Sequence, residues 1–313
     1  MAPASSTHQL FGDVLAAAVA ERRSQIVLGL DPHPDALWPQ AQEGLAGLDH
    51  ASPPERAAAA VTAHCRALID AAAPACVAVK PQLACFERLA APGRVALAQV
   101  IAHARAAGLL VIADAKRGDI DVTAQAYAQS LFDGLSTPYG LVPGLAAHAA
   151  TVNPLMGADT IAPFVHAARP RAAGLFVLVR TSNPGAAHLQ ELILADGSPV
   201  WQRLAAIVHE LGRDAVGESG LSDVGAVVGA TAPAVLASAR EIMPHAVFLL
   251  PGVGAQGGRV EDLAPAFAPG PAAGLVSASR SIARAHEHIN LSPASAAREE
   301  AERLRALAWS LVA

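Results

Sequence analysis

LLVIADAKRGDI, residues 109–120, joins an apolar and partly β-branched run to an Asp-x-Lys-x-x-Asp cluster. The run predicts a buried parallel strand, because it is apolar on both faces. Side chains alternate along a strand, so Asp114 and Lys116 are expected to share one face. Gly118 allows the chain to turn, and we expect Asp119 to fold back toward the same place. Burying one ammonium between two carboxylates is costly unless the charges are paired, so this strand end indicates a functional site.

The composition is that of a globular protein with a large core. The 313 residues are 53% hydrophobic and 16% charged, which excludes wholesale disorder. The net charge of −5, with both signs interspersed, argues against nucleic acid as a partner. Cys65, Cys76 and Cys85 lie in apolar surroundings and are expected to be buried free thiols. The N-terminus lacks a signal-peptide core and no apolar run approaches ~18 residues, so we expect a cytoplasmic protein that contacts no membrane.

Short apolar runs alternate with helix-like segments along the whole chain. Eight runs are strand candidates: Ile26–Asp31, Cys76–Pro81, Leu109–Lys116, His148–Asn153, Gly174–Asn183, Gly225–Thr231, Val247–Gly254 and Gly274–Ser279. Helix candidates between and after them include Pro54–Ala73, Gly93–Ala107, Val200–Gly212, Ala232–Met243 and Ala296–Leu311. This alternation predicts an α/β fold, a (β/α)8 TIM barrel, rather than a doubly wound sheet.

The connections between these elements predict the domain organisation. No linker rich in Pro, Gly or Ser divides the chain, so we expect a single domain over residues 1–313 that includes an N-terminal helix. Residues 184–199 form a connection longer than most βα loops, and we expect them to be a surface insertion near the site. The fourth strand candidate is Ala-rich over residues 146–151, a composition that also fits a helix.

Seven of the eight strand candidates end in polar residues, at the ends where barrel enzymes carry their chemistry. The charged ones include Asp31, Lys80, Asp114, Lys116, Asp119 and Arg280. Their coincidence on successive strands indicates one site rather than scattered solvated charges. The turn PGVGAQGG at residues 251–258 exposes backbone N–H groups, and with Gln256 and Arg280 it predicts a phosphate site. The GxGxxG pattern in this turn follows the seventh strand rather than the first, so we set a Rossmann fold aside.

Taken in order, these motifs resemble the orotidine 5′-monophosphate decarboxylase family, in its longer bacterial subgroup (type 2), from about Leu28 to Ile282. The matching segments are LGLD (28–31), VKP (79–81), DAKRGDI (114–120), TSN (181–183), VGAT (228–231), PGVGAQGG (251–258) and SRSI (279–282). The resemblance implies a carboxy-lyase that converts orotidine 5′-monophosphate to UMP in de novo pyrimidine synthesis. It also implies a homodimer that uses neither a metal nor an organic cofactor.

The resemblance assigns a role to each matching position. Asp31 and Lys80 are expected to contact the ribose, Asp114, Lys116 and Asp119 to form the catalytic array, Ser182 to contact the pyrimidine, and Gln256 and Arg280 to hold the phosphate. Asp119 and the ribose-binding Thr123 are expected to be shared across the dimer interface. The sequence departs from the family pattern at two places, so the local packing of the pocket is not predicted there. Gln82 stands where Asn is expected, and Leu155-Met156 lacks an expected aromatic residue.

Residues of these types suit the reaction. Loss of CO2 from C6 of the pyrimidine leaves a carbanion, which needs a fixed positive charge and a proton source. Lys116 can supply both, and its flanking carboxylates favour the charged ammonium and hold it in place. Asp114 or Asp119 can in addition crowd the departing carboxylate, a contribution to which we give less weight than to preorganisation.

Two alternatives remain open from the sequence. A Mg²⁺-dependent sugar-phosphate synthase or decarboxylase, of the hexulose-phosphate synthase and ketogulonate-phosphate decarboxylase group, shares the barrel and the Asp-x-Lys-x-x-Asp motif. The continuation at residues 117–120 and Ser182 favour the nucleotide enzyme. The second alternative is a catalytically silent nucleotide-binding barrel, which the retained charged positions disfavour because a sensor needs no proton donor.

Overall fold

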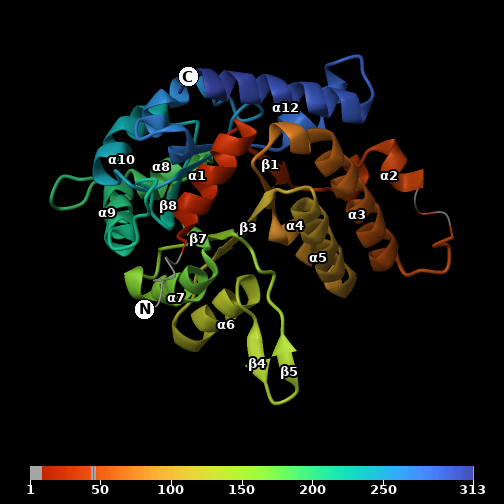
Figure 1. Ribbon diagram of the computed structural model, residues 1–313, viewed down its shortest axis with the longest axis horizontal. Coiled ribbons are helices and arrows are strands. Elements are labelled where there is room, and N and C mark those ends of the chain that lie inside the picture. The colour runs from red at the N-terminus through yellow and green to blue at the C-terminus, as the bar shows by residue number, and fades with distance from the viewer. Residues whose placement is uncertain (1–8, 44, 46, 313) are drawn as a thin grey trace, which may run out of the picture.

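Eight parallel strands close into a barrel in the computed structural model, which describes residues 9–43, 45 and 47–312. The strands are β1 (Ile26–Leu30), β2 (Ala78–Pro81), β3 (Leu110–Arg117), β6 (Ala149–Val152), β7 (Gly174–Arg180), β8 (Val224–Val228), β9 (Phe248–Pro251) and β10 (Gly274–Ala278). Each strand pairs with its neighbours in chain order, and β10 closes the barrel on β1. Helices surround the strands (Figure 1). The single-domain (β/α)8 barrel predicted from the sequence is therefore confirmed.

Several predicted strands extend too far at their carboxyl ends. The fifth candidate was expected to reach Asn183, but β7 ends at Arg180, and the sixth was expected to reach Thr231, but β8 ends at Val228. The polar residues beyond these points leave the hydrogen-bonded ladder and turn into the mouth of the barrel. The Ala-rich fourth candidate is a strand, β6, whose four residues are all buried.

Helices separate the barrel strands along the chain and form the outer layer; between β9 and β10 they are the 3-10 helices Val260–Phe267 and Pro271–Ala273, and elsewhere they include α-helices. The described α-helices are α1 (Phe11–Arg22), α2 (Pro39–Glu43), α3 (Pro53–Ala72), α4 (Leu83–Glu87), α5 (Ala90–Ala106), α6 (Asp121–Leu131), α7 (Ala162–Ala168), α8 (Ala187–Gln190), α9 (Val200–Gly212), α10 (Leu236–Ile242), α11 (Arg280–Ala283) and α12 (Pro293–Ser310). The C-terminal helix begins three residues earlier than predicted, because Ser292 caps it and Pro293 suits its first turn. The helix α10 begins later, because a short 3-10 helix, Pro233–Val235, precedes it.

The helix α1 packs against the amino-terminal end of the barrel. Its buried face carries Phe11, Leu15 and Val19, which belong to the same hydrophobic cluster as the barrel residues Val27 and Phe176. The rings of Phe11 and Phe176 meet edge to face at 6.1 Å. Apolar side chains therefore close the amino-terminal end of the barrel, and the carboxyl ends of the strands remain open for a polar site. Among the described helices, none combines the length and the apolar character needed to cross a membrane.

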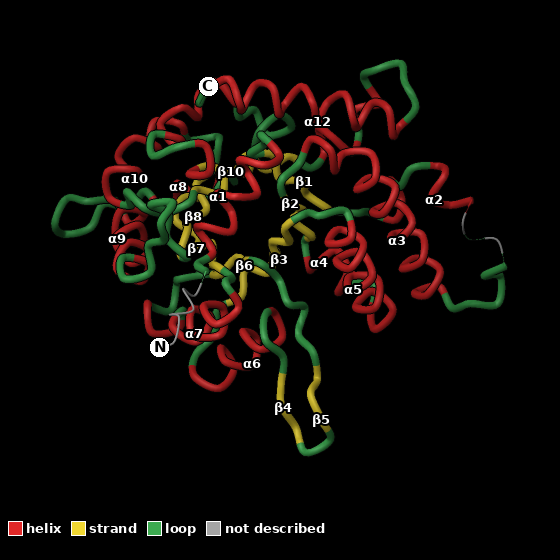
Figure 2. Tube along the Cα trace, viewed as in Figure 1, coloured by secondary structure: helices red, strands yellow, loops and turns green. Residues whose placement is uncertain are grey.

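A two-stranded antiparallel hairpin, β4 (Leu135–Thr137) and β5 (Gly140–Val142), was not predicted. It follows α6 and extends away from the barrel (Figure 2). Its residues are exposed on both faces apart from the half-buried Thr137, so it lacks the alternation of apolar and polar residues that marks a half-buried strand.

Candidate active site

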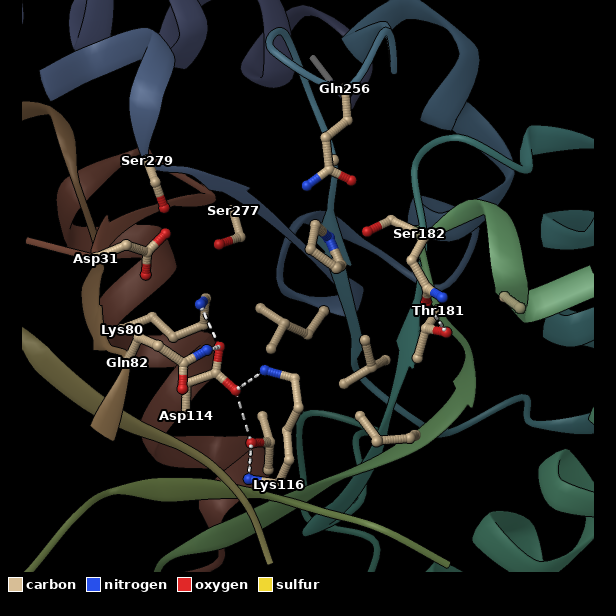
Figure 3. Close-up of a pocket in the computed structure, with 18 of the residues that line it drawn as sticks. Asp31, Lys80, Gln82, Asp114, Lys116, Thr181, Ser182, Gln256, Ser277 and Ser279 are labelled. Atoms are coloured by element: carbon tan, nitrogen blue, oxygen red, sulfur yellow. Dashed lines mark hydrogen bonds and ion pairs between the residues drawn. The ribbon is translucent and has the colours of Figure 1, made fainter. Parts of the chain in front are cut away.

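A cavity of about 570 Å³ opens at the carboxyl ends of the barrel strands. Seven of the predicted site residues line it: Asp31, Lys80, Asp114, Lys116, Ser182, Gln256 and Arg280. In Figure 3, Lys80, Asp114 and Lys116 gather on one side, with Ser182 across the cavity and Gln256 at another edge. The volume is within the range of sites that enclose a small organic ligand.

Asp114 is the centre of the charged cluster. Its carboxylate is buried, with the residue 4% exposed, and it binds two ammonium groups. Lys80 Nζ lies 2.5 Å from Oδ2 and Lys116 Nζ lies 2.6 Å from Oδ1. Lys80 is itself buried, whereas the side chain of Lys116 is 45% exposed and faces the cavity. Lys116 is therefore the more accessible of the two ammonium groups to a ligand in the cavity.

The two lysines determine the protonation of Asp114. Burial alone would raise the pKa of this carboxyl, but the positive charges of Lys80 and Lys116 outweigh burial and hold the pKa at about 2. For Lys80, burial lowers the pKa, and the charges of Asp114 and Asp31 raise it by more, so the net shift is upward. The buried Asp114–Lys80 pair is thus ionised at neutral pH and forms a fixed charge array.

Lys80 has a larger part in this array than the sequence indicated. The family resemblance placed it on the ribose, together with Asp31. Its ammonium makes the shortest contact of the Asp114 network and also lines the cavity. Because β2 lies beside β3 in the barrel, the ends of these two strands bring Lys80 and Asp114 together.

Two further donors to Asp114 were not predicted as site residues. Thr151 Oγ1, on β6, donates to Asp114 Oδ1 at 2.9 Å, and Gln82 Nε2, after β2, donates to Oδ2 at 3.3 Å. The only sequence signal for Thr151 is a lone polar residue in the buried run AATV at 149–152. Its partner depends on the register between β3 and β6, which the sequence does not specify.

The backbone at Lys116 departs from a regular strand. Ala113 pairs with Ala150 and Arg117 with Val152, so four steps along β3 face two steps along β6. Lys116 has φ +48°, a left-handed conformation that costs a non-glycine residue roughly 1–2 kcal/mol. Its backbone N–H donates to Thr151 Oγ1 at 2.9 Å. Bulges of this kind re-aim side chains next to active sites.

Asp119 and Thr123 do not line the cavity that the described residues form. Asp119 lies between β3 and α6, where its Oδ1 accepts a hydrogen bond from the backbone of Ile120 at 2.8 Å. The neighbouring side chains Ile120 and Val122 are 54% and 78% exposed. The expectation that Asp119 folds back onto Lys116 is therefore not met within one chain.

The two departures from the family pattern lie in different surroundings. Gln82 lines the cavity and contributes to the Asp114 network, so it has a direct effect on the pocket. Leu155 and Met156 are 73% and 47% exposed and are not among the described residues that line the cavity. The missing aromatic thus leaves an exposed aliphatic surface after β6.

The predicted phosphate end is built around the glycine-rich turn after β9. Gly252 has φ +102°, and a Cβ there would lie 3.1 Å from Ser182 Cβ and 3.3 Å from Gln256 Oε1. Glycine therefore allows the turn to pass between the two predicted ligand-binding residues. Gln256 and Arg280 both line the cavity, as expected for a site that holds an anionic group.

The segment at residues 184–199 forms one wall of the cavity. Ala186, Leu189 and Gln190 line the cavity, and Gln190 Oε1 accepts a hydrogen bond from Thr181 N at 2.8 Å. An ion pair of 2.8 Å between Arg180 and Glu191 ties the segment to the end of β7. The segment therefore contributes to the shape of the cavity.

Comparisons with known proteins show the family to which the chain belongs. A model of the family described as Orotidine 5′-phosphate decarboxylase / HUMPS matches residues 24–292. The chain is 41% identical to the orotidine 5′-phosphate decarboxylase of Rhodopirellula baltica over 288 residues, 91% of this chain and 92% of that protein. It is 40% identical to the protein of the same name from Deinococcus radiodurans over 296 residues, 94% of this chain and 95% of that protein. The structure of Leishmania donovani OMP decarboxylase aligns with a TM-score of 0.69 and 31% identity, covering 96% of this chain and 99% of that one. The chain belongs to the orotidine 5′-phosphate decarboxylase / HUMPS family.

Proposed function

We propose that this protein decarboxylates orotidine 5′-monophosphate to UMP and CO2, a step of de novo pyrimidine synthesis, without a metal or an organic cofactor. The observation that carries the proposal is the Asp114 carboxylate, buried between two ammonium groups, with Lys116 exposed to the cavity. The names of the relatives at 40% and 41% identity support the same reaction.

The chemical step needs only Lys116 as an acid. The bond between C6 and the carboxylate carbon breaks, CO2 leaves, and the electron pair remains on C6. The Lys116 ammonium stabilises this charge and transfers a proton from Nζ to C6, and solvent then reprotonates the amine. Because Asp114 already holds Nζ at 2.6 Å, little reorganisation accompanies the developing charge. Repulsion between Asp114 and the substrate carboxylate is a smaller contribution in this account.

The remaining cavity residues orient the substrate. Ser182 contacts the pyrimidine, and Gln256 and Arg280 bind the 5′-phosphate beside the glycine-rich turn. Asp31 and Lys80 contact the ribose, so Lys80 serves both the sugar and the charge array. The positions of these side chains around one cavity support this assignment.

We propose that the active protein is a homodimer in which Asp119 and Thr123 enter the neighbouring subunit's site. Support comes from two paired strands, β3 and β6, whose ends are followed by exposed aliphatic side chains. These side chains are Ile120, Val122, Leu155 and Met156. Covering them with a second copy would bury apolar surface and deliver the Asp119 carboxylate to another subunit.

The family description includes a second type of chemistry, the sugar-phosphate enzymes that use Mg²⁺. In this site both oxygens of Asp114 already accept ammonium donors, which leaves a poor ligand for a divalent cation. The discriminating experiment follows the absorbance of orotidine 5′-monophosphate with and without excess chelator. The proposal requires equal turnover in both, whereas chelator-sensitive turnover of a sugar phosphate, or tight UMP binding without turnover, would contradict it.

We place the protein in the cytoplasm. Its three cysteines are all free, and burial raises the pKa of the Cys76 thiol to about 12. Unpaired thiols are typical of proteins that fold in a reducing compartment. Fractionation of the native cells with an antibody to this chain measures the location directly.

A further inference from the structure

We propose that Thr151 is a positioning residue for decarboxylation, because its hydroxyl group fixes both ends of Lys116. This inference rests on the proposed function, in which Lys116 is the proton donor. The residue is 1% exposed, lies on β6, and does not belong to any of the motifs that carry the family resemblance.

The direction of the hydrogen bonds at Thr151 is determined by its partners. The backbone N–H of Lys116 can only donate, so Thr151 Oγ1 is its acceptor at 2.9 Å. The ionised Asp114 carboxylate can only accept, so the single hydroxyl proton of Thr151 goes to Oδ1 at 2.9 Å. Both capacities of the hydroxyl are therefore used by the catalytic motif.

These contacts close a ring through the proton donor itself. The backbone of Lys116 donates to Thr151, Thr151 donates to Asp114 Oδ1, and the same Oδ1 accepts Lys116 Nζ at 2.6 Å. A lysine side chain has four rotatable bonds, and this ring restrains it at its backbone and at its ammonium. Figure 3 shows the dashed contacts that connect Asp114 and Lys116.

The bulge explains why a side chain has to make this contact. At Lys116 the ladder between β3 and β6 is interrupted, and the residue is in the left-handed region. Its N–H therefore finds the Thr151 hydroxyl in place of a strand carbonyl. Without that hydroxyl, the N–H and the strained backbone lose the partner that fixes the ammonium over the cavity.

The test compares Thr151→Val, which keeps the shape but removes the hydroxyl, with Thr151→Ser, which keeps the hydroxyl. We expect Thr151→Val to lower kcat by about 10- to 100-fold, since a small misplacement of a reacting group costs this much. We expect KM and the Kd of UMP to change by less than about 3-fold, because the phosphate and base contacts are intact. Thr151→Ser is expected to keep kcat within about 3-fold of wild type.

A matched control separates positioning from the general loss of a buried hydroxyl. Thr62 is also buried, and its hydroxyl donates to Ala58 O at 2.8 Å within α3, outside the site. Thr62→Val is expected to leave kcat unchanged. If Thr151→Val does not fold, Thr151→Ala replaces it, because it also removes the hydroxyl and adds no bulk.

Each outcome bears on one claim. Normal kcat in folded Thr151→Val, equal losses in Thr151→Val and Thr151→Ser, or a parallel loss of UMP affinity would overturn the positioning role while leaving decarboxylation intact. Absence of turnover in the wild-type protein would overturn the proposed function, and the role of Thr151 with it.

Discussion

Asp114 and Asp119 stand five positions apart in one motif, yet their environments are opposite. Asp114 is buried and accepts hydrogen bonds from four side chains: Lys80, Gln82, Lys116 and Thr151. Asp119 lies after the end of β3 and is half-buried. Among the described residues, its carboxylate accepts one hydrogen bond, which the Ile120 N–H donates. The spacing of a motif therefore does not place its members in one site.

The difference in burial between Asp114 and Asp119 determines which partners each carboxylate needs. A buried charge is tolerated only when it is paired, so the chain must supply every partner of Asp114 from its own neighbouring strands. Asp119 remains accessible beside exposed aliphatic side chains and has no such requirement within one subunit. In the proposed dimer, Asp114 belongs to the fixed array of its own barrel, and Asp119 completes the array of another.

The largest expected effect is on catalysis by the Asp114 array. Lys116→Ala should lower kcat/KM by at least ~10⁴-fold, or ~5.4 kcal/mol, because it removes both the proton and the fixed positive charge. The control is Arg117→Ala. The Arg117 side chain pairs with Glu87 and packs over Tyr127, so its removal is expected to lower kcat/KM by less than about 3-fold. Near-normal turnover of Lys116→Ala in the absorbance assay would disprove its assignment.

The second-largest expected effect is on the stability of the protein, and it differs between substitutions of the two aspartates. Asp114→Asn leaves the buried Lys80 without its hydrogen-bonded carboxylate and should lower the free energy of unfolding by about 3–5 kcal/mol. Asp119→Asn should lower the free energy of unfolding by much less than Asp114→Asn does, because among the described residues its carboxylate accepts only one backbone hydrogen bond and balances no buried ammonium of its own subunit. Urea unfolding at pH 7 and one protein concentration measures both. Equal destabilisation by the two substitutions would remove the contrast between them.

The third effect is the acid dependence of stability. The pKa of Asp114 falls from an ordinary 3.8 to about 2 on folding, so between these pH values the unfolded chain binds the proton more readily. Stability should therefore be lost as the pH drops from about 4 to about 2, by roughly 2 kcal/mol. Thermal melts across this range should show the loss in wild type and in Asp119→Asn but not in Asp114→Asn. If stability depended on pH in the same way in all three proteins, Asp114 would not be the group responsible for the loss.

The smallest expected effect is at the phosphate end. Arg280→Ala should raise KM and lower kcat/KM by at least ~10-fold, the effect of losing one charged hydrogen bond of ~1.5 kcal/mol. Arg284, one turn away, is outside the described lining of the cavity and lies 3.8 Å from Glu287, so Arg284→Ala serves as the control. An unchanged kcat/KM in Arg280→Ala would exclude it from the phosphate site.

Much of the fold and part of the site could be predicted from the sequence. Buried parallel strands have apolar runs, so all eight were found, and the barrel then placed Asp31, Lys80, Asp114 and Lys116 at one end. The register between β3 and β6 could not be predicted, because a bulge shifts it at Lys116. The Thr151 contact depends on that register and was missed.

The other gaps have physical causes of their own. The hairpin of β4 and β5 is almost entirely exposed, so no pattern of burial marks its strands in the sequence. The Asp-x-Lys-x-x-Asp spacing indicated that Asp119 turns back, but α6 begins at Asp121 and carries the chain past the cavity. An interaction between subunits leaves no signal in the periodicity of one chain.

The most direct test of the central claim, that one motif serves two sites, combines two inactive subunits. Lys116→Ala and Asp119→Ala chains with different tags are co-expressed, and the mixed dimer is purified through both tags. In that dimer, one site contains an intact Lys116 and Asp119 of the partner subunit, while the other lacks both groups. We expect the mixed dimer to have about half of the wild-type turnover per dimer, far above either parent. Turnover of the mixed dimer no higher than the mean of the two parents would contradict it.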